Sequence, residues 1–538
     1  MRNCILPKAP PPASTVAPGG YPGAESGEGG MTPVEVAPAK MPRIGTIEER
    51  FQSYNIEMVE VTGGEFWKPY AETSGAQIEN EKRASWDAHD GTPTGMDPGV
   101  YALRPPVDLS RARLRKLAAA LGPAYVRVSG TWANTTYFSP SEQAPAAPPA
   151  GFLGVLTCRQ WSGVIEFAHA VDARVVTSFA TCAGVRDTAG VWCPEQARLL
   201  LEFTRNAGGS IAAAELMNEP TVAAIGGAPA GYDAAAYGRD FRVFLAFARR
   251  AAPEMAILGP GSIGETDGNW GVTFDSIGLL KTPDLLTASG GGVDAFSYHH
   301  YGAISRRCAA LGILQTKLDD ALSEAWLART DETLSFYRNL REEFEPDAPL
   351  WLTETADAAC GGNPWASTFL DTFRYLDQLG RLARQEVQVI AHNTLAASDY
   401  GLLDERTLAP RPSYWGALLW RKLMGTVVLN SGVPIRDGLH VYAHSLRGAP
   451  GGVALLVINN DKVAARSLTI PVASERYTLS STELLGRTVL LNGTALELQD
   501  DGALPHLAGA PTGAGLVMFA PATITFLAVP LAGNAASR

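Results

Sequence analysis

The sequence contains few cysteines: six in 538 residues, and none of them in a C-x-x-C pair. This scarcity excludes a disulfide-rich scaffold and argues against a zinc site. Cys182 and Cys193 are close enough in sequence to bridge one loop, but we interpret them as two unpaired thiols. No cluster of metal-ligating residues stands out, so we expect neither a metal nor an organic cofactor.

Basic residues and long apolar runs are also scarce. With 44 Lys and Arg against 55 Asp and Glu, the formal net charge is −11, so we do not expect nucleic acid as a partner. The most apolar window, Ala514–Pro530, is interrupted by Pro521, and no segment qualifies as a membrane span. Residues 1–40 lack the apolar core of a signal peptide, so none is recognised.

What is present is a normal globular balance, with 46% hydrophobic and 18% charged residues. The first 40 residues differ, because they hold eight prolines and six glycines. Such a composition cannot bury enough surface to order itself, so we predict a disordered leader over residues 1–42. The length of the remaining chain predicts more than one domain.

From Arg50 onward, short apolar runs alternate with helical patterns. Eight runs have the character of buried strands, namely Ser53–Val61, Ala124–Ser129, Arg174–Phe179, Ala213–Glu219, Ala256–Pro260, Ala295–Tyr301, Leu350–Thr355 and Val387–Leu395. The helical patterns include Leu109–Leu121, Trp161–Val171, Pro194–Asn206, Tyr232–Ala251, Leu311–Phe344 and Ala366–Gln385. This alternation predicts a (β/α)8 TIM barrel over residues 43–412, whose first strand region can also contribute to a second domain. A doubly wound sheet is the alternative, but no G-x-G-x-x-G opens a helix after a strand.

Beyond Arg411 the pattern changes. One more helix, Tyr414–Leu423, precedes short alternating strands that are separated by turn residues. These strands are Thr426–Leu429, Gly438–Ser445, Val453–Asn459, Ser467–Pro471, Tyr477–Ser481, Val489–Leu491, Leu516–Phe519 and Ile524–Val529. They predict an additional C-terminal β-sandwich domain over residues 413–538, with a short flexible tail.

Two glutamates stand where two predicted barrel strands end. The fourth strand leads into Asn218, Glu219 and Pro220, and the seventh contains Glu354. The C-terminal ends of barrel strands meet at one mouth, where catalytic residues cluster. A retaining glycosidase requires two carboxylates about 5 Å apart, one protonated and one ionised. We therefore predict a glycoside hydrolase with Glu219 and Glu354 as catalytic residues, while Asn218 suits a hydrogen bond to the sugar 2-hydroxyl.

Further motifs occur in a fixed order around these glutamates. They are Phe51–Glu57, Pro123–Arg127, Gly130-Thr131, Glu215–Pro220, Gly259-Pro260, Tyr298–Tyr301, Trp351–Thr355, Gly361-Gly362, Asp399–Asp404, Pro412–Leu419 and Leu423–Thr426. In this order they resemble glycoside hydrolase family 79, the heparanase-like β-glucuronidases, over residues 50–530, and we expect a bacterial member. The resemblance implies cleavage of β-linked glucuronic acid in glycans or glucuronides by double displacement.

The resemblance also implies roles for individual residues. Glu219 becomes the acid/base and Glu354 the nucleophile. The uronate carboxylate is then held by the backbone amides of Gly361 and Gly362 and by Tyr400, because successive amides in a turn form an anion nest. Cys360 stands where a third glycine is expected.

Three residues end the sixth predicted strand. By resemblance, His300 and Tyr301 are the pair that contacts the sugar or orients the nucleophile. His299 we interpret as a histidine of the core, which is the usual fate of a histidine within a barrel strand.

Two more positions carry open alternatives. Glu57 matches an acidic residue that holds a sugar hydroxyl in the family, and the alternative is a buried structural carboxylate. Arg306 and Arg307 follow the sixth strand. They suit either a basic rim for a sulfated chain or an ordinary solvated loop.

Animal family members carry a long excised linker after the Gly-Thr segment, whereas here only Ser139–Gly151 follows Thr131. We therefore expect a single chain that is active without proteolysis, and we also expect it to be a monomer. The resemblance leaves a secreted or periplasmic location open. Two other functions remain: another retaining enzyme of the clan, such as a β-xylosidase or arabinofuranosidase, or a non-catalytic glycan-binding protein, against which the retention of both glutamates argues.

Overall fold

The computed structural model describes residues 34–70, 97–143, 145–268, 279–311, 315–500 and 502–537. Residues 1–33 of the predicted leader lie outside these ranges. No helix in the described ranges is both long enough and apolar enough to span a bilayer.

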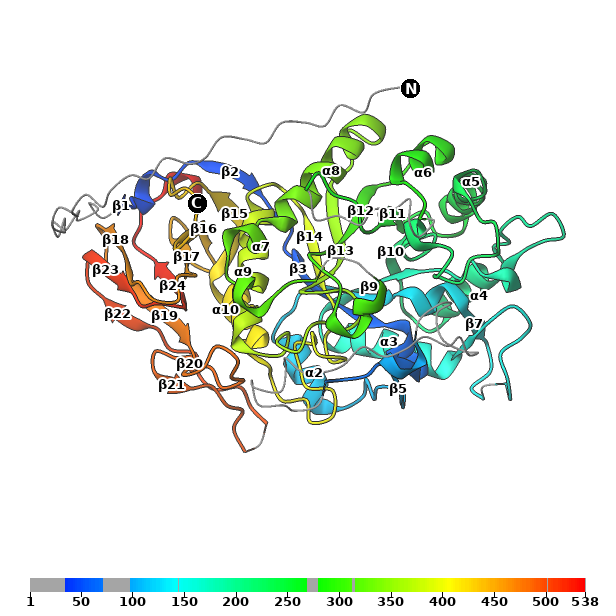
Figure 1. Cartoon of the computed structure of the whole chain (residues 1–538), viewed down its shortest axis with the longest axis horizontal. Coiled ribbons are helices and arrows are strands. Elements are labelled where there is room, and N and C mark those ends of the chain that lie inside the picture. The colour runs from blue at the N-terminus through cyan, green and yellow to red at the C-terminus, as the bar shows by residue number, and fades with distance from the viewer. Residues whose placement is uncertain are drawn as a thin grey trace, which may run out of the picture. The chain divides into compact units, whose positions relative to one another are not determined.

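Eight parallel strands close into a barrel (Figure 1). In spatial order they are β10 (Ile211–Glu215), β11 (Ala256–Ser262), β12 (Ala295–Tyr301), β13 (Leu350–Ala356), β14 (Val389–His392), β3 (Gln52–Glu57), β6 (Ala124–Ser129) and β9 (Ala173–Ser178). Each strand pairs with its successor in the chain, and β14 returns to pair with β3. All eight predicted strands are present, so the barrel prediction is confirmed.

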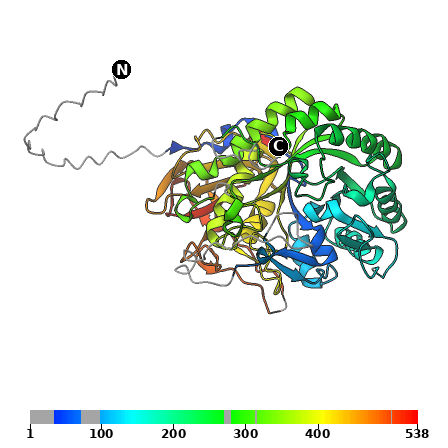
Figure 2. The same cartoon turned by 45° about the vertical axis from the view of Figure 1, so that its right-hand side comes forward.

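Helices lie along the outside of the barrel, and Figure 2 shows several of them in green beside the strands. They are α2 (Ala112–Ala119), α3 (Cys158–Ala170), α4 (Glu195–Asn206), α5 (Ala234–Ala251), α6 (Thr282–Ser289), α7 (Glu324–Leu327), α8 (Arg329–Phe344), α9 (Phe369–Ala383) and α10 (Pro412–Leu423). The prediction of one long helix over Leu311–Phe344 is wrong. Ser323 accepts a hydrogen bond from the Trp326 amide and starts α7, so the helical path begins there.

The barrel interior has an apolar floor beneath a polar layer. Seven buried side chains, one from each of seven strands, form the floor: Tyr125, Val176, Ala213, Leu258, Ala295, Trp351 and Val389. Alternate residues of a strand face the same side. Two positions further toward the C-terminal ends, the inward residues are therefore Arg127, Glu215 and Thr353, and Thr353 Oγ1 donates to Glu215 Oε1 at 3.0 Å.

Two sheets face each other in the C-terminal part of the chain (Figure 1). One contains, in order, β2 (Arg43–Thr46), β15 (Met424–Leu429), β16 (His440–Leu446), β17 (Val453–Asn459), β24 (Thr523–Val529), β19 (Ser474–Ser480), β20 (Leu490–Leu491) and β21 (Thr494–Ala495), with β22 (Ala510–Thr512) on β19. The other contains β1 (Val34–Glu35), β18 (Arg466–Ile470) and β23 (Gly515–Phe519). A shared apolar core between the two sheets makes them a sandwich, as predicted.

The two ends of the sandwich domain are more ordered than predicted. Residues 34–42 were expected in the disordered leader, but Val34 pairs with Leu468 and both Val36 and Met41 are buried in the sandwich core. The last residues, up to residue 537, do not form a flexible tail either. The buried side-chain amide of Asn534 donates hydrogen bonds to the carbonyls of Pro38 and Met41. Both segments gain apolar and hydrogen-bond partners that their own composition does not reveal.

Short elements follow the barrel strands at the mouth. They are α1 (Met58–Thr62), the pair β4 (Gly64–Trp67) and β5 (Tyr101–Arg104), the pair β7 (Thr136–Ser139) and β8 (Gly154–Thr157), and the 3-10 turns η3 (Thr131–Thr135) and η5 (Pro220–Val222). The first strand thus stops at Glu57, four residues before the predicted end. Glu60 accepts a hydrogen bond from the Glu57 amide at 2.9 Å and starts α1 there.

Candidate active site

The two predicted catalytic glutamates meet inside the barrel mouth. Glu354 lies in β13, and Glu219 follows β10 in a left-handed backbone conformation with φ 48°. One carboxylate oxygen of each glutamate and Nδ1 of His299 all lie within 4.8 Å of one another. All three side chains are buried. The structure therefore brings together two residues that are far apart in sequence.

Arg127 connects the two glutamate-bearing strands from below. Its Nη1 donates to Glu354 Oε2 at 2.8 Å, and its Nη2 donates to Glu215 Oε2 at 2.9 Å and to Asn218 Oδ1 at 2.8 Å. Burial alone would raise the pKa of Glu215, but the Arg127 charge and hydrogen bonds lower it below its usual value. The carboxylates in turn raise the pKa of Arg127. Arg127 and Glu215 thus form a buried ion pair that also supports Glu354.

Glu219 has a different electrostatic environment. Burial raises its pKa to about 7, with a smaller upward contribution from Glu215, while the Arg127 charge opposes the rise. A carboxyl group of this kind holds its proton up to neutral pH and can donate it. The two glutamates of the mouth are therefore not equivalent.

His299 lies in this site, not in the core as predicted. Its Nδ1 is 2.9 Å from Glu219 Oε1, and its Nε2 is 3.3 Å from Arg127 Nη2. Burial lowers the pKa of His299 to about 4, so the ring is neutral. A guanidinium has no acceptor, hence Nε2 must accept and Nδ1 must carry the proton. His299 consequently donates to Glu219 and fixes its position.

His300 faces the opposite way. Its Nδ1 lies 2.8 Å from Thr333 Oγ1 on α8, so the prediction that it lines the site is wrong. Neighbouring residues of a strand alternate between faces, and His299 takes the inward position. Tyr301 faces inward again, and its hydroxyl donates to Glu354 Oε1 at 2.7 Å. Tyr301 thus lies beside Glu354, as predicted.

Asn393, just beyond β14, joins the remaining predicted side chains. Its Nδ2 donates to Glu57 Oε1 and the Tyr301 hydroxyl, both at 2.9 Å, and to the Tyr400 hydroxyl at 3.2 Å. Burial, and next the Glu354 charge, raise the pKa of Glu57 well above its usual value. The side-chain amide of Asn393 thereby holds three side chains together beside Glu354, namely those of Glu57, Tyr301 and Tyr400.

The loop after β13 has an unusual backbone. Cys360, Gly361 and Gly362 all have positive φ, at 64°, 83° and 84°. Among the described residues, neither glycine amide donates a hydrogen bond to the protein, whereas Asn363 donates its amide to Asp357 at 3.1 Å. A turn with free, successive amides is suited to bind an anion. Cys360 adopts the left-handed conformation that explains why a glycine is expected there.

The two arginines after the sixth strand both interact with other side chains of the protein. Arg307 donates to Asp399 Oδ2 at 2.6 Å and to the Cys360 carbonyl at 3.0 Å. The guanidinium of Arg306 lies over the Trp365 ring, 5.1 Å from its centroid. Arg307 therefore supports the glycine loop and is neutralised by a carboxylate.

Asn218 retains one unused hydrogen-bonding group. Its Oδ1 accepts from Arg127, but its Nδ2 is buried and has no partner among the described residues. A buried donor without a partner is costly, so such a group points to a ligand. The same region could be considered for a metal, because Glu219, His299 and Glu354 present three potential ligand atoms. The Arg127 guanidinium, however, already places a positive charge on Glu354 and faces His299.

Several site residues escaped the sequence analysis: Arg127, Glu215, His299 and Asn393. The first two carried a usable signal, since each is a charged residue in a strand whose other residues are mostly apolar. Cys182, Cys193, Cys158, Cys308 and Cys360 are free, which confirms the interpretation of Cys182 and Cys193 as unpaired.

The chain is similar in sequence or in fold to several known proteins. Mouse heparanase is 29% identical over 472 residues, which cover 77% of this chain and 84% of that protein. Baicalin-beta-D-glucuronidase of Scutellaria baicalensis is 32% identical over 265 residues, covering 47% of this chain and 45% of that protein. The solved α-L-arabinofuranosidase of Thermotoga maritima superposes with a TM-score of 0.59 at 13% identity over 92% of this chain and 99% of its own, a similarity of fold.

The family model "Glycosyl hydrolase family 79, N-terminal domain" matches residues 106–380, just over half of the chain. This range begins before the second barrel strand and ends within α9, and it contains both glutamates of the mouth. The chain belongs to glycosyl hydrolase family 79.

Proposed function

We propose that this chain is a retaining β-glucuronidase in which Glu354 is the nucleophile and Glu219 the acid/base. The observation that carries the proposal is the unequal pair of buried carboxyl groups whose oxygens lie within 4.8 Å. Retaining glycosidases have carboxyl groups about 5 Å apart, whereas inverting enzymes leave a wider space for a water molecule. The names of two relatives, a heparanase and a β-glucuronidase, support the same activity.

In the first step, Glu354 attacks the anomeric carbon while Glu219 transfers its proton to the leaving-group oxygen. Arg127 and Tyr301 each donate a hydrogen bond to one oxygen of Glu354, and these bonds hold the nucleophile in position. In the second step, Glu219 accepts a proton from water, and the resulting hydroxide displaces Glu354 and restores the β configuration. The free Nδ2 of Asn218 suits the sugar 2-hydroxyl.

Selection of a uronic acid is assigned to the glycine loop. The amides of Gly361 and Gly362 are unused within the described residues. Tyr400 is adjacent to this loop, because a Cβ on Gly362 would lie 3.2 Å from Tyr400 Cβ, and its hydroxyl accepts a hydrogen bond from Asn393 Nδ2. Burial raises the pKa of Tyr400 well above its usual value, so its hydroxyl stays protonated and able to donate. Together these groups offer a carboxylate three donors.

The test compares kcat/KM for 4-nitrophenyl β-glucuronide, β-glucoside and β-xyloside. A site with donors for a carboxylate leaves them unpaired when the substrate lacks it, so we expect a preference of about a hundredfold or more for the glucuronide. Tyr400→Phe should reduce that preference by roughly tenfold, because it removes one charge-assisted hydrogen bond. A preference for the xyloside would contradict the proposal, and binding without turnover of any substrate would indicate a glycan-binding protein.

The stereochemical course is tested separately by proton NMR during the first minutes of reaction. Double displacement releases the β-anomer first. Initial release of the α-anomer would exclude the nucleophilic role of Glu354 even if the preference for glucuronides is found.

A further inference from the structure

Two free cysteines, Cys308 and Cys360, meet beside the glycine loop that follows β13. Cys308 lies in the 3-10 turn η7 (Arg306–Leu311) after β12, and Cys360 directly precedes Gly361. Both thiols are unpaired, and both side chains belong to one apolar cluster. They come from the loops of two successive barrel strands, so the fold brings them together.

The backbones of these two loops are bonded to each other close to the thiols. Ile304 and Ala359 form a parallel bridge, and the Ser305 amide donates to the Ala359 carbonyl at 2.9 Å. Arg307 adds a side-chain bond from its Nη1 to the Cys360 carbonyl at 3.0 Å. The approach of the two thiols is therefore set by several backbone contacts on either side of them.

The two thiols are in direct contact. A hydrogen bond with the Cys308 thiol, and next burial, raise the pKa of Cys360 well above its usual value. The same hydrogen bond places the two sulfur atoms next to each other, as the closure of a disulfide requires. Cys308 is 3% exposed and Cys360 is partly exposed, so a reagent from the solvent reaches Cys360 first.

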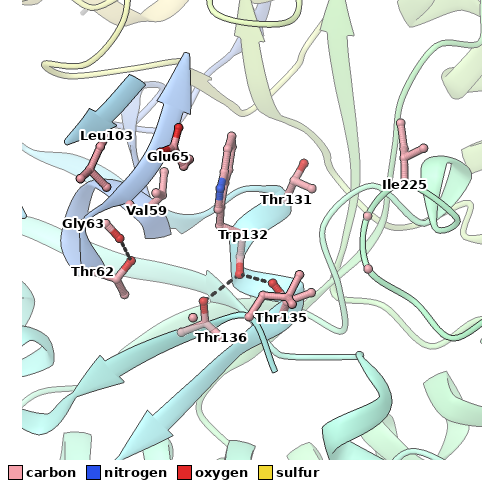
Figure 3. Close-up of a pocket in the computed structure, with 15 residues that line it drawn as sticks. Val59, Thr62, Gly63, Glu65, Leu103, Thr131, Trp132, Thr135, Thr136 and Ile225 are labelled. Carbon is pink, nitrogen blue, oxygen red and sulfur yellow. Dashed lines mark hydrogen bonds between the residues drawn. The ribbon is translucent and has the colours of Figure 1, made fainter. Parts of the chain in front are cut away.

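Aromatic rings of the mouth pack against the same cluster. Trp67 lies 4.8 Å from Tyr101 and Trp132 lies 6.3 Å from Tyr101, measured between ring centroids, and all three belong to the cluster. Trp132 also stands in the wall of a pocket of about 240 Å³ (Figure 3). The cysteine pair is thus part of the packing that connects this pocket wall to the glycine loop.

The position of Cys360 means that a bond between the thiols acts on the glycine loop. Cys360 has a φ of 64°, a left-handed conformation that a residue other than glycine enters at a cost. The loop is closely packed, because a Cβ on Gly361 would lie 2.1 Å from Arg307 Nη1 and 2.6 Å from Ser398 Oγ. A covalent bond from Cys360 to Cys308 fixes the residue that precedes the two free amides.

We propose that Cys308 and Cys360 form a disulfide that joins the two loops when the protein meets an oxidant of the disulfide class. This modification site goes beyond the proposed glucuronidase function and does not depend on it. The bond ties the start of the glycine loop to η7.

The reaction proceeds by two exchanges. In the first step, the Cys360 thiolate attacks one sulfur of a small disulfide such as oxidised glutathione and releases one glutathione thiol. In the second step, the Cys308 thiolate attacks Cys360 in the mixed disulfide and releases the second glutathione thiol. The two protein thiols give up two electrons, which reduce the reagent, and their two protons end on the two released thiols.

The first experiment counts thiols. The protein is fully reduced, freed of reductant, incubated with oxidised glutathione and then denatured for thiol titration. We expect it to lose two of its six thiols. Peptide mapping without reductant should recover the Cys308 and Cys360 peptides joined to each other. The rate should rise about tenfold per pH unit between about pH 7 and 8.5, because the raised pKa of Cys360 leaves little thiolate.

Two single variants separate the pair from the other cysteines. In Cys308→Ser, Cys360 has no partner, so the reaction should stop at the mixed disulfide and glutathione should be recovered on Cys360. Cys182→Ser is the matched control, because Cys182 is also free and is 2% exposed. It should lose the same two thiols as the wild type.

The second experiment measures what the bond does to the two loops. The amides of Ser305 and Ala359 bond across the junction, and we expect their hydrogen exchange to be about tenfold slower in the oxidised protein, because the bond opposes local opening. The Tm should rise by about 2–4 °C, since the cross-link also restricts the unfolded chain. Cys308→Ser should show neither change.

Three results would overturn the proposal. One is a full set of six thiols after prolonged incubation at the highest pH. The second is a joined peptide that contains any other cysteine in place of Cys308 or Cys360. The third is equal hydrogen exchange of Ser305 and Ala359 in the oxidised and reduced protein. Each of these measurements can be made whether or not the protein hydrolyses a glucuronide, so they are distinguishable from a failure of the proposed function.

Discussion

At the scale of single residues, the two glutamates of the mouth differ because their neighbours differ. Glu354 receives hydrogen bonds from Arg127 and Tyr301, whereas Glu219 receives one from the neutral His299 and is otherwise buried. An arginine charge favours ionisation, and burial opposes it. The packed neighbours thus give two identical side chains different hydrogen-bond partners, and burial raises the pKa of Glu219 to about 7.

This difference predicts the pH dependence of activity. The pKa of Glu219 is raised to about 7, so the proton that the leaving group needs is present below pH 7 and lost above it. We expect kcat/KM for methyl β-glucuronide to decline as pH rises through about 7. The pH profile of Glu219→Gln should lack this decline, and its residual rate should be higher on 4-nitrophenyl than on methyl β-glucuronide, because a good leaving group needs no proton. Equal losses on both substrates would contradict the acid/base role.

At the scale of elements, the turn from β6 into η3 depends on Gly130. Its φ is 88°, and a Cβ placed on it would lie 1.4 Å from Glu57 Oε2. No side chain fits at this position unless Glu57 moves. The resemblance motif Gly130-Thr131 therefore has a physical basis, which is the close approach of a backbone to a catalytic-site carboxyl group.

Gly130→Ala tests this dependence. The substitution adds strain in the left-handed region and displaces Glu57, so we expect a destabilisation of about 1–3 kcal/mol and at least a tenfold loss of kcat/KM. Urea unfolding and kinetics on an aryl glucuronide measure the two effects. Gly163→Ala in α3 is the matched control, because nothing lies within 4 Å of the added Cβ. It should stabilise the protein by about 0.5–1 kcal/mol and leave kcat/KM unchanged; wild-type kinetics in Gly130→Ala would refute the argument.

At the scale of the whole molecule, a buried charge cluster joins the sandwich to the barrel helices. His440 of β16 contacts Asp377 of α9 at 2.5 Å through Nδ1, and Glu324 of α7 at 3.0 Å through Nε2. Arg381 of α9 bonds to the same two carboxylates and to Asp331 of α8. Both ring nitrogens thus face carboxylates, which favours the imidazolium form.

The cluster predicts how stability depends on pH. Burial alone would lower the pKa of His440, but Asp377 and Glu324 together raise it to about 9, against Arg381. A raised histidine pKa contributes stability that is complete below the unfolded value of about 6.5 and is lost as pH rises through about 9. We expect the Tm to fall by several degrees between pH 6.5 and 9.5 in a calorimetric scan.

The variant His440→Gln should have a lower Tm at pH 6.5 and a flatter dependence up to pH 9.5. His444→Gln is the control, because burial lowers the pKa of His444 to about 4 and it stays neutral throughout this range. It should retain the wild-type slope. An identical slope in His440→Gln would remove His440 as the source of the effect.

The features of the fold that could be predicted are those that interactions between neighbouring residues determine. The apolar strands and the turns between them carry their signal in short windows, so all eight barrel strands and the sandwich were predicted. Positions at strand ends were less certain, as at Glu57, where the capping side chain of Glu60 ends the strand early. The order of residues 34–42 depends on strand partners more than 400 residues away, and no local pattern encodes them.

By itself, the sequence determined the barrel, the sandwich and the two glutamates at strand ends, because periodicity and strand position are properties of neighbouring residues. Only the tertiary structure decided which histidine enters the site, since the faces of β12 depend on its register in the closed barrel. It also decided that Arg127 forms ion pairs with both Glu215 and Glu354. These outcomes require segments far apart in sequence to meet, and long-range contacts are set by the packing of the whole chain.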